Sequence, residues 1–578
     1  MDGFSFDHSV LFEGLDLNVP PFVLARSLQT RSSSSSSRRR LLPEHTRQEF
    51  AEKYPYFTTK EADVAYRKCL KMEPSFGEAE KFIIAYSTVK RPPIEADIDP
   101  DDYIFVRSGP HAQMAHLNLF NRPDEPRPMI EELTQAYEHV LSLLDVPNKE
   151  PFPERWRLAA VIYEPDKFAG IDYALRGLAK RREAETLAQK DAELAYDRLM
   201  AGLYVEPHRA RMGGKGKHVH QDDYDADSCT GRMILMTSHR DLKLNGITEN
   251  MLTQTYLADH YPIGLGLSWW HGGCDRFLGR FKDFDRYHCL DAKKFDANIN
   301  GWMVRMAIDV IRRQFLNGAD AQYDAYWDFV YDGMVQTTLY RDDGLCFRKY
   351  VGSNSGHPLN SLLQSIITLI IAYAAMLLLN PDLPPEEVFS HVWVESLGDD
   401  NIIGIRDSHK ICSDGLDTVA NIYFRIDWSG KKSFSTDRFL GDKFDGVQFL
   451  GKYFRKATML DGDAYRLQAV IPFRPARETF LKLYFEPDRY RLPEDDQERL
   501  KYVYMRAVGH WYDCAGNPEM RKWMDGFLDW LETIMVGPPP TEWAPEILQW
   551  FTRGHRGMEV PKCGRISYDK WIRLVIMP

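Results

Sequence analysis

The sequence predicts an α+β fold, in which helices and strands are mixed through the middle of the chain and helices prevail towards its C-terminal end. Three patterns predict this fold. Apolar and polar residues alternate through residues 392–405, apolar residues dominate residues 366–379, and apolar stripes recur at helical spacing through residues 500–534. With 578 residues, 44% of them apolar, the chain can bury a large core or several domains.

Charge and cysteine usage exclude several classes of protein. The formal net charge is -11, so the chain does not coat nucleic acid over its whole surface, and any nucleic-acid site is a local basic channel. None of the eight cysteines forms a CxxC pair, which fits free thiols in a reducing compartment better than a disulfide framework or a zinc finger. The first residues are acidic and lack the basic start of a signal peptide, so we expect none.

The N-terminal region is expected to be a disordered tail over residues 1–44. Residues 23–43 contain five arginines, a run of six serines and no acidic residue. Such a tail could touch RNA, a capsid or a targeting receptor, or be a plain flexible segment. Residues 89–102, rich in proline and acid, are a second candidate linker.

Several helices follow from the apolar spacing. One is expected from Ile299 to Asn317-Gly318, and two more near the C-terminus, separated by the break at residues 516–518. The apolar run at residues 366–379 has 14 residues, whereas a membrane-spanning helix needs about 20, so a buried core helix of a soluble protein is expected there.

The alternating segment at residues 392–405 predicts a β-hairpin with two carboxylates at its tip. Gly398 supplies a permissive backbone, and Asp399 and Asp400 follow it directly. A solvated, aspartate-rich turn is one interpretation. A magnesium site is the other, because hard cations take carboxylate oxygens and neutralise the repulsion between neighbouring acids.

Two further segments carry candidate site residues. Asp291 closes a short apolar segment and Asp296 follows five residues later, where an ordinary helix N-cap is the alternative role. Gly352, Ser355 and Gly356 form a small-residue loop ahead of the buried helix. Loops of this type present backbone N–H groups and hydroxyls to phosphate or ribose, although many buried helices begin in the same way.

The order of these segments resembles that of viral RNA-dependent RNA polymerases, and in particular those of partitiviruses and related bisegmented double-stranded RNA viruses. The resemblance covers roughly residues 205–460. It rests on the following stretches: Asp291-x4-Asp296, then Ser355-Gly356 with Asn360 and Gln364, then Gly398-Asp399-Asp400, the "IDWSGKKSF" segment with Lys431 and Lys432, "VQFLGKYF" through Phe449, Leu450 and Gly451, and "GRMILM" around Arg232.

The resemblance implies a right-hand polymerase that copies RNA from ribonucleoside triphosphates by a two-metal mechanism. Asp291 and Asp399 would be the principal ligands of two Mg²⁺ or Mn²⁺ ions, with Asp400 in support. Asp296, with Asn360 or Gln364, would recognise the ribose 2'-hydroxyl.

The family pattern also assigns roles to basic residues. Arg232, with Lys217 and also Lys215, would hold the triphosphate, although a solvated basic loop is the alternative for the two lysines. Lys432 or Lys431 would protonate the leaving pyrophosphate, with a plain surface lysine pair as the alternative. The sequence departs from the usual pattern at three positions: Asn360 stands where threonine is usual, Gln364 where asparagine is usual, and Asn401 is a minority choice after the two aspartates.

The resemblance further implies the domains and partners of the chain. We expect an N-terminal extension and fingers at 45–285, a palm with an inserted fingers segment at 286–455 and a thumb at 456–578. The expected partners are the RNA template and product duplex, ribonucleoside triphosphates and a viral capsid protein, without a membrane, in the host cytoplasm inside the virus particle.

Three alternatives to this interpretation remain open. A reverse transcriptase shares the palm and its acidic pair, but usually has an aromatic residue where this chain has Asp296. A non-catalytic RNA-binding or capsid protein would use the Arg/Ser tail but leaves the ordered acidic segments unexplained. A zinc cluster could be drawn from His218, His220, Asp222 and Cys229, but its spacing is irregular.

Overall fold

The computed structural model describes the chain from residue 42 onwards, apart from short gaps. The described ranges are 42–67, 70, 72–95, 98–225, 232–258, 260–461, 465–487, 490–554 and 559–577. Most of the predicted tail therefore lies outside the described residues, as do Cys69 and Cys229. Glu44 already begins helix α1 (Glu44–Lys53), so the first helix starts inside the range assigned to the tail.

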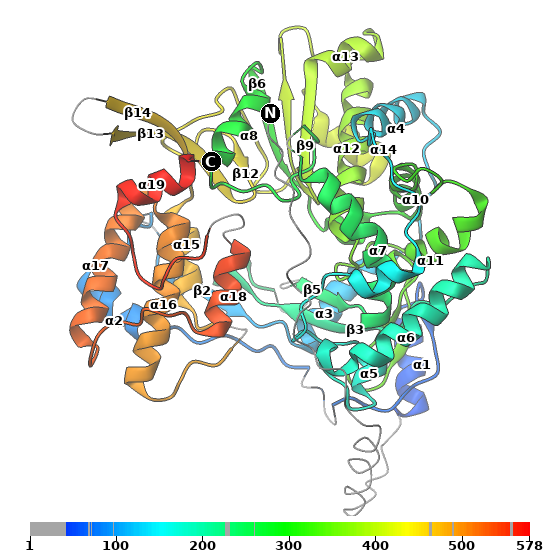
Figure 1. Cartoon of the computed structure of the whole chain (residues 1–578), viewed down its shortest axis with the longest axis horizontal. Coiled ribbons are helices and arrows are strands. Elements are labelled where there is room, and N and C mark those ends of the chain that lie inside the picture. The colour runs from blue at the N-terminus through cyan, green and yellow to red at the C-terminus, as the bar shows by residue number, and fades with distance from the viewer. Residues whose placement is uncertain are drawn as a thin grey trace, which may run out of the picture. The chain divides into compact units, whose positions relative to one another are not determined.

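The mixed α/β character predicted from the sequence is confirmed (Figure 1). A four-stranded antiparallel sheet has the strand order β11-β6-β10-β9. Its strands are β11 (Phe434–Thr436), β6 (Arg286–Asp291), β10 (Asp400–Ile405) and β9 (Val392–Leu397). Strands β9 and β10 pair as the hairpin that the alternating segment predicts.

Three other sheets are present among the described residues. A five-stranded sheet has the order β1-β8-β7-β3-β5, and β3 and β7 are its parallel pair. Its strands are β1 (Thr58–Thr59), β8 (Cys346–Arg348), β7 (Thr338–Tyr340), β3 (Ala210–Lys215) and β5 (Arg232–Met236). The smaller sheets pair β2 (Tyr103–Val106) with β4 (Lys217–His220), and join β12 (Gln448–Phe449), β13 (Lys452–Asp461) and β14 (Tyr465–Phe473).

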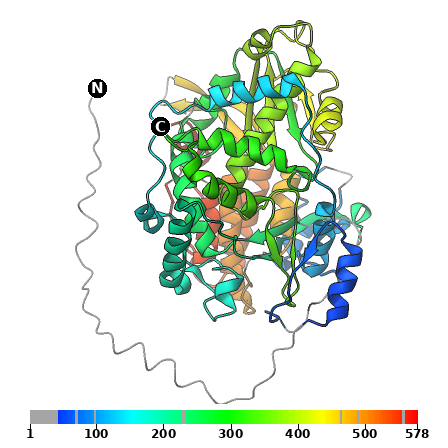
Figure 2. The ribbon, with the colours of Figure 1, turned by 90° about the vertical axis from the view of Figure 1, so that its right-hand side faces the viewer.

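Helix α12 (Asn360–Leu379) is the buried core helix predicted from residues 366–379. It packs against β9 and against α4 (Glu131–Leu143), α10 (Gly301–Arg312) and α14 (Leu416–Phe424). Figure 2 shows α4 as the cyan helix across the green and yellow elements of this region. Within the described residues α12 alone is long and apolar enough to cross a membrane, but 89% of its most apolar stretch is buried inside the protein.

The helix predicted from Ile299 to residue 318 has different ends. A short helix, α9 (Phe295–Asn298), comes first; α10 begins at Gly301 and ends at Arg312. At the break, the Arg122 guanidinium donates to the Ala297 and Ile299 carbonyl oxygens at 2.8 and 3.1 Å. Side-chain donors of this kind satisfy carbonyl groups that have no partner within a helix where the helix ends.

The C-terminal region is helical, as the apolar stripes predict. Helices α16 (Asp496–Cys514) and α17 (Pro518–Ile534) are separated at Asn517, whose side chain accepts hydrogen bonds from the first backbone N–H groups of α17. An N-terminal helix, α2 (Lys81–Val89), packs on α17, with the Tyr86 ring 5.2 Å from that of Trp523. Figure 1 shows the blue α2 beside these orange helices.

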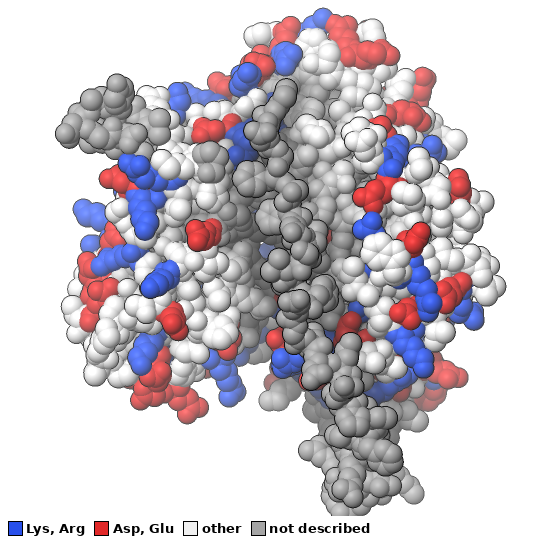
Figure 3. Space-filling model, in the orientation of Figure 1, with Lys and Arg blue, Asp and Glu red and all other residues white. Residues whose placement is uncertain are grey.

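Ten further α-helices are found among the described residues. They are α3 (Pro110–Leu117), α5 (Ile171–Ala174), α6 (Arg181–Met200), α7 (His239–Tyr256), α8 (Gly273–Phe281), α11 (Asp324–Met334), α13 (Pro385–His391), α15 (Ala476–Tyr484), α18 (Pro545–Gly554) and α19 (Tyr568–Ile576). On the face drawn in Figure 3, Lys and Arg residues are interspersed with Asp and Glu residues. The local basic channel expected from the net charge stays a prediction.

Candidate active site

The four-stranded sheet places two of the predicted carboxylates opposite each other. In the antiparallel pairing of β10 with β6, Asp400 is the direct partner of Asp291. Directly paired residues have Cβ atoms about 4.5–5.5 Å apart on the same face of a sheet, and like charges in that relation are destabilising. Segments more than a hundred residues apart in sequence therefore bring two acids together at the end of the hairpin.

Asp399 lies in the turn between β9 and β10, and α12 fixes that turn. Gly398 has a φ of 68°, a conformation that favours glycine. Its backbone N–H donates to Ser365 Oγ at 2.8 Å, and its carbonyl accepts from Thr368 Oγ1 at 2.7 Å. Both hydroxyls come from α12, so the buried helix holds the backbone from which the adjacent carboxylate projects.

The electrostatics of Asp400 reflect this crowding. Burial, together with the charges of Asp399 and Asp291, raises the pKa of Asp400 to about 7. The hydrogen bond from the Leu450 backbone N–H to Asp400 Oδ2, at 3.0 Å, and the positive charge of Lys432 act in the opposite direction. This carboxyl group therefore titrates near neutrality in the protein without a cation.

A loop at residues 427–433 lies against Asp291 and carries both candidate lysines. Ser433 Oγ accepts from the Asp291 backbone N–H at 3.0 Å, which joins the loop to the end of β6. Lys432 is close enough to Asp400 to lower its pKa, whereas the exposed Lys431 forms an ion pair with Asp223 at 3.3 Å. Of the two lysines, Lys432 is the one whose charge acts on the pKa of Asp400.

Asp296 lies in α9, and its carboxylate is held from two sides. Oδ1 accepts from the Ala297 backbone N–H at 3.0 Å, and Oδ2 lies 3.4 Å from Nε2 of His116, on α3. The N-cap residue of α10 is Asn300. Asp296 therefore does not have the alternative role of N-cap for the helix predicted from Ile299 onwards. His116 was missed by sequence reasoning, since a lone histidine in a partly apolar helix carries no signal.

The loop at residues 353–356 packs between β5 and α12. Ser355 Oγ donates to the Met233 carbonyl at 3.4 Å, and Gly356 lies so close to β5 that a Cβ there would be 1.7 Å from the Leu235 carbonyl oxygen. The Ser353 backbone N–H donates to the Asp296 carbonyl at 2.8 Å. These contacts bring the loop beside Asp296, as the order of the segments predicted.

Gln364 and Asn360 differ in their surroundings. Gln364 Nε2 donates to Ser353 Oγ at 2.7 Å, and a Cβ at Gly398 would lie 3.4 Å from Gln364 Oε1, so this side chain lies between the loop and the hairpin turn. Asn360 Oδ1 is buried and has no hydrogen-bond partner among the described residues. A buried acceptor without a donor is costly, which makes it a candidate for a ligand hydroxyl.

The structure describes the basic residues near β5 only in part. Arg232 begins β5 opposite Lys215 of β3, and nothing of the Arg232 side chain is described. Lys217 is exposed on β4, which pairs with β2 in a separate two-stranded sheet. The structure therefore puts Lys215, rather than Lys217, directly across from Arg232.

Neither the zinc alternative nor a preformed metal site appears among the described residues. Over those ranges no group of three or more His, Cys, Asp or Glu side chains is arranged to hold a metal ion, and this includes the three aspartates. His220 Nδ1 and Asp222 Oδ2 are 3.6 Å apart, and Cys229, the cysteine of the proposed zinc cluster, lies outside the described residues.

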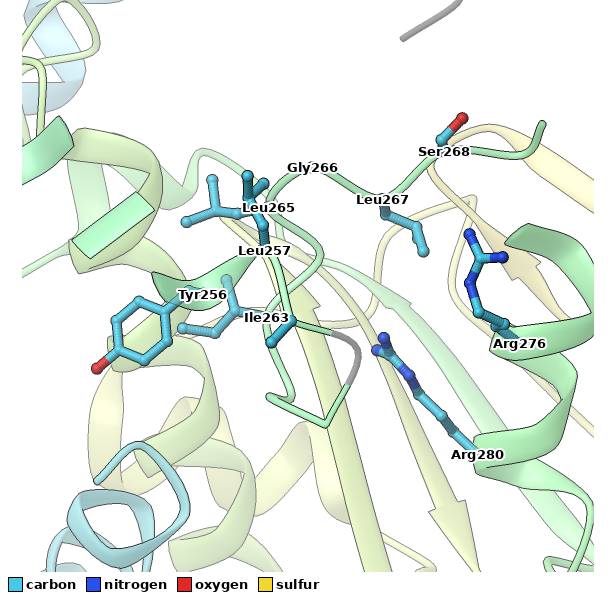
Figure 4. Close-up of a pocket in the computed structure, with 10 residues that line it drawn as sticks. Tyr256, Leu257, Ile263, Leu265, Gly266, Leu267, Ser268, Arg276 and Arg280 are labelled. Carbon is cyan, nitrogen blue, oxygen red and sulfur yellow. The ribbon is translucent and has the colours of Figure 1, made fainter. Parts of the chain in front are cut away.

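A cavity among the described residues lies outside this group of residues. It has a volume of about 200 Å³ and is lined by residues between Tyr256 and Arg280 (Figure 4). Arg280 forms an ion pair with the buried Glu395 of β9, and Arg276 donates to the His271 carbonyl at 2.7 Å. Figure 4 shows both arginines extending from α8 towards the cavity, while none of the predicted site residues lines it.

Comparison with models of protein families indicates the class of protein. Residues 249–467 match the family model of viral RNA-dependent RNA polymerases. The matched segment contains every candidate residue from Asp291 to Lys432 and excludes Arg232 and Lys217. The match supports an RNA-directed RNA polymerase, a nucleotidyltransferase in general terms.

Particular relatives are viral polyproteins of low identity. The genome polyprotein of Peanut mottle virus (strain M) is 24% identical over 169 residues, which is 29% of this chain and 5% of that protein. That of Plum pox potyvirus (strain El amar) is 25% identical over 160 residues, 27% of this chain and 10% of that protein. That of Papaya ringspot virus (strain P / mutant HA 5-1) is 23% identical over 250 residues, 43% of this chain and 34% of that protein.

The chain thus spans a small part of the relatives that it matches, about 5% of the Peanut mottle virus polyprotein. These relatives are potyviral, and they do not show the finer resemblance to partitivirus polymerases. That part of the sequence interpretation stays a prediction.

Proposed function

We propose that this chain is a viral RNA-dependent RNA polymerase that transfers ribonucleoside monophosphates from NTPs to the 3'-hydroxyl of an RNA strand copied from an RNA template. The observation that carries the proposal is the pairing of Asp291 with Asp400 beside the Asp399 turn, within the segment that matches the polymerase family. In this proposal the four-stranded sheet is the palm, the five-stranded sheet with β5 belongs to the fingers, and the helices from α15 onwards form the thumb.

The three aspartates would hold divalent cations. Their oxygen donors are the type that Mg²⁺ and Mn²⁺ prefer, and a cation would neutralise the like charges of Asp399 and Asp291, which add to the effect of burial in raising the pKa of Asp400. Since they do not form a three-ligand group as they stand, binding requires their side chains to turn towards the ion. Two such ions, when bound, would stabilise the attacking and leaving oxygens of an in-line displacement.

The chain's own residues supply positioning and proton transfer. Lys432, near Asp400, is proposed to donate a proton to the leaving pyrophosphate, and Arg232 with Lys215 or Lys217 to hold the triphosphate. Asp296 is proposed to accept from the ribose 2'-hydroxyl, and the unpartnered Asn360 Oδ1 offers a second acceptor to a sugar hydroxyl. Gln364, held by Ser353, would link this sugar site to the catalytic turn.

The biological setting is proposed on the same basis. The RNA template, the product duplex and NTPs would be the partners, with a capsid protein as a further partner inside the virus particle in the host cytoplasm. The double-stranded RNA virus context is part of this proposal and rests on the order of the sequence segments.

The test is an incorporation assay with the full chain. Purified protein, an RNA template, labelled NTPs and Mg²⁺ or Mn²⁺ should give a product whose sequence follows the template, and the Asp399→Asn variant should give none. The Asp382→Asn variant, altered at an exposed aspartate, is the matched control and should behave as wild type. Use of deoxynucleotides in preference to ribonucleotides would instead favour a reverse transcriptase. RNA binding without any incorporation would favour the capsid-protein alternative.

A further inference from the structure

His116 connects the proposed sugar-recognition residue to the neighbouring five-stranded sheet. It is buried on α3, with 5% of its surface exposed. Its Nδ1 accepts a hydrogen bond from the Met233 backbone N–H at 2.7 Å, and its Nε2 lies 3.4 Å from Asp296 Oδ2. One imidazole ring thus contacts strand β5 with one nitrogen and the carboxylate with the other.

The hydrogen bond from Met233 determines which ring nitrogen of His116 carries the proton. A ring nitrogen that accepts a hydrogen bond carries no proton, so the neutral ring of His116 carries its proton on Nε2. Nε2 is the nitrogen that lies 3.4 Å from Asp296 Oδ2. The second oxygen of Asp296 accepts from the Ala297 backbone N–H at 3.0 Å. A carboxylate has about four lone-pair positions, and these contacts are compatible with a further one from a ligand hydroxyl.

The same residue of β5 also contacts the Ser-Gly loop. The Met233 N–H binds His116, and its carbonyl oxygen accepts from Ser355 Oγ at 3.4 Å. Met233 directly follows Arg232, the residue proposed to hold the triphosphate. The backbone of one residue, Met233, therefore contacts both His116 and the Ser355 loop, and it is adjacent in sequence to the proposed triphosphate contact.

We propose that His116 is a positioning residue for sugar discrimination, which orients the Asp296 carboxylate towards the ribose 2'-hydroxyl and holds it in register with β5. This inference rests on the proposed function. A site built to hydrogen-bond a substrate hydroxyl discriminates through the geometry of its buried polar groups. Loss of the Nε2 contact would let the Asp296 carboxylate rotate, so recognition of the hydroxyl weakens while the reaction itself is kept.

Two conservative variants separate the two contacts of the ring. In His116→Asn the side-chain oxygen can replace Nδ1 and accept from Met233, but the side chain is too short to reach Asp296. In His116→Gln the longer amide can replace the Nε2 donor, while the acceptor for Met233 is lost. A third variant, His116→Phe, fills the same space with neither contact and supplies a second test if the asparagine variant does not fold.

The measurement is the ratio of kcat/KM for a ribonucleotide to that for the matching deoxynucleotide on one RNA template, together with a melting curve. His116→Asn and His116→Phe should lower the ratio by about 5-fold or more, the effect of one weakened hydrogen bond to a charged group. His116→Gln should keep the ratio near the wild-type value even if it melts earlier. A role in packing alone predicts altered melting temperatures with one unchanged ratio in all three variants, and that result would overturn the inference.

The Asp296→Ala variant distinguishes failure of the inference from failure of the proposed function. If His116 acts through Asp296, the double variant His116→Asn/Asp296→Ala should have the same ratio as Asp296→Ala alone. A ratio that falls for Asp296→Ala but not for His116→Asn or His116→Phe overturns the role of His116 and leaves the polymerase intact. Wild-type protein that shows no template-dependent incorporation overturns the proposed function, and the inference with it.

Discussion

Asp291 and Asp400 are direct cross-strand partners, and the pKa of Asp400 is raised mainly by burial, with the like charges of Asp399 and Asp291 adding to the rise. Ordinary sheets avoid like charges in this relation because the repulsion is not offset. The pair is instead kept at the end of a hairpin whose turn is held by two hydroxyls of a buried helix. A rigid turn that holds mutually repelling carboxylates is typical of a functional site, and a bound cation would relieve the repulsion.

The first prediction concerns the stability of the cation-free protein. The pKa of Asp400 is raised to about 7 from an ordinary value of about 3.9 in an unfolded chain. Its contribution to stability is therefore fully present below about pH 4 and is lost as the pH rises through 7. In a chelating buffer, Asp400→Asn should raise the melting temperature relative to wild type, and by more at pH 8 than at pH 5.

Added Mg²⁺ provides the complementary test of this prediction. Protons and cations compete for the same carboxylates, so Mg²⁺ should raise the wild-type melting temperature more at pH 8 than at pH 5. The gain should be smaller in Asp400→Asn and unchanged in the control Asp382→Asn, which alters an exposed residue. An equal effect of Mg²⁺ on all three proteins at both pH values would contradict the assignment.

The second prediction separates the two adjacent lysines. Lys432 lies close enough to Asp400 to affect its pKa, while Lys431 pairs with Asp223 at the surface. A positioned general acid contributes about 10²- to 10⁴-fold, so Lys432→Ala should lower kcat by about 100-fold. Lys431→Ala should change kcat by less than about 2-fold, since an exposed ion pair contributes about 0–1 kcal/mol. Single-turnover incorporation rates check both, and equal losses in the two variants would argue for a general effect of charge.

The local elements of the fold could be predicted from the sequence because their patterns are local. Strand alternation gave the hairpin at residues 392–405, and apolar spacing gave α12, α16 and α17. The break between α9 and α10 could not be predicted, because Arg122, which binds the carbonyl groups there, is more than 170 residues away in sequence. Long-range contacts of this kind leave no periodic signal.

The candidate site likewise has residues that could be predicted from the sequence and residues that could not. The carboxylates and the Ser355-Gly356 loop were found because their residue types and order carry a family resemblance. His116, Ser365 and Ser433 were missed, although each contacts a candidate residue or its backbone. A buried serine or histidine has no distinctive sequence pattern, and its partner is identified only when the chain is folded. The choice between Lys431 and Lys432 likewise depended on Asp223, a residue far away in sequence.

The third prediction concerns the close approach of the Ser-Gly loop to β5. A Cβ at Gly356 would lie 1.7 Å from the Leu235 carbonyl oxygen, and a backbone atom in a sheet cannot move away cheaply. Gly356→Ala should therefore destabilise the protein by about 1–3 kcal/mol and lower incorporation, since the loop must shift away from β5. In the control Gly279→Ala, on α8, the added Cβ meets no atom within 4 Å. That variant should be neutral or slightly stabilising by helix propensity.

Denaturant unfolding and incorporation rates, measured on both glycine variants, test this prediction. A stable Gly356→Ala protein with wild-type rates would show that the loop and β5 separate readily. It would also remove the packing argument for the position of Ser355.

The last prediction concerns the two hydroxyls that hold the catalytic turn. Ser365 Oγ accepts from the Gly398 N–H at 2.8 Å, and both groups are buried. Ser365→Ala leaves that N–H unsatisfied, at a cost of about 1–3 kcal/mol, and loosens the backbone that carries Asp399. The nucleotide contacts proposed for Asp296 and Asn360 do not depend on this bond. Ser365→Ala should therefore lower kcat by about 10-fold or more while the KM for NTP changes little.

Two neighbouring variants make the result specific to the turn. Thr368→Val removes the donor to the Gly398 carbonyl and should have a smaller effect of the same kind, because a carbonyl oxygen tolerates the loss of a partner better than an N–H group does. Ser361→Ala changes an exposed hydroxyl one turn away on the same helix and should leave both constants unchanged. Steady-state measurements of kcat and KM on the wild type and the three variants test this prediction. If Ser365→Ala is destabilised but keeps the wild-type kcat, the position of Asp399 does not depend on α12, and the turn is fixed by the strands alone.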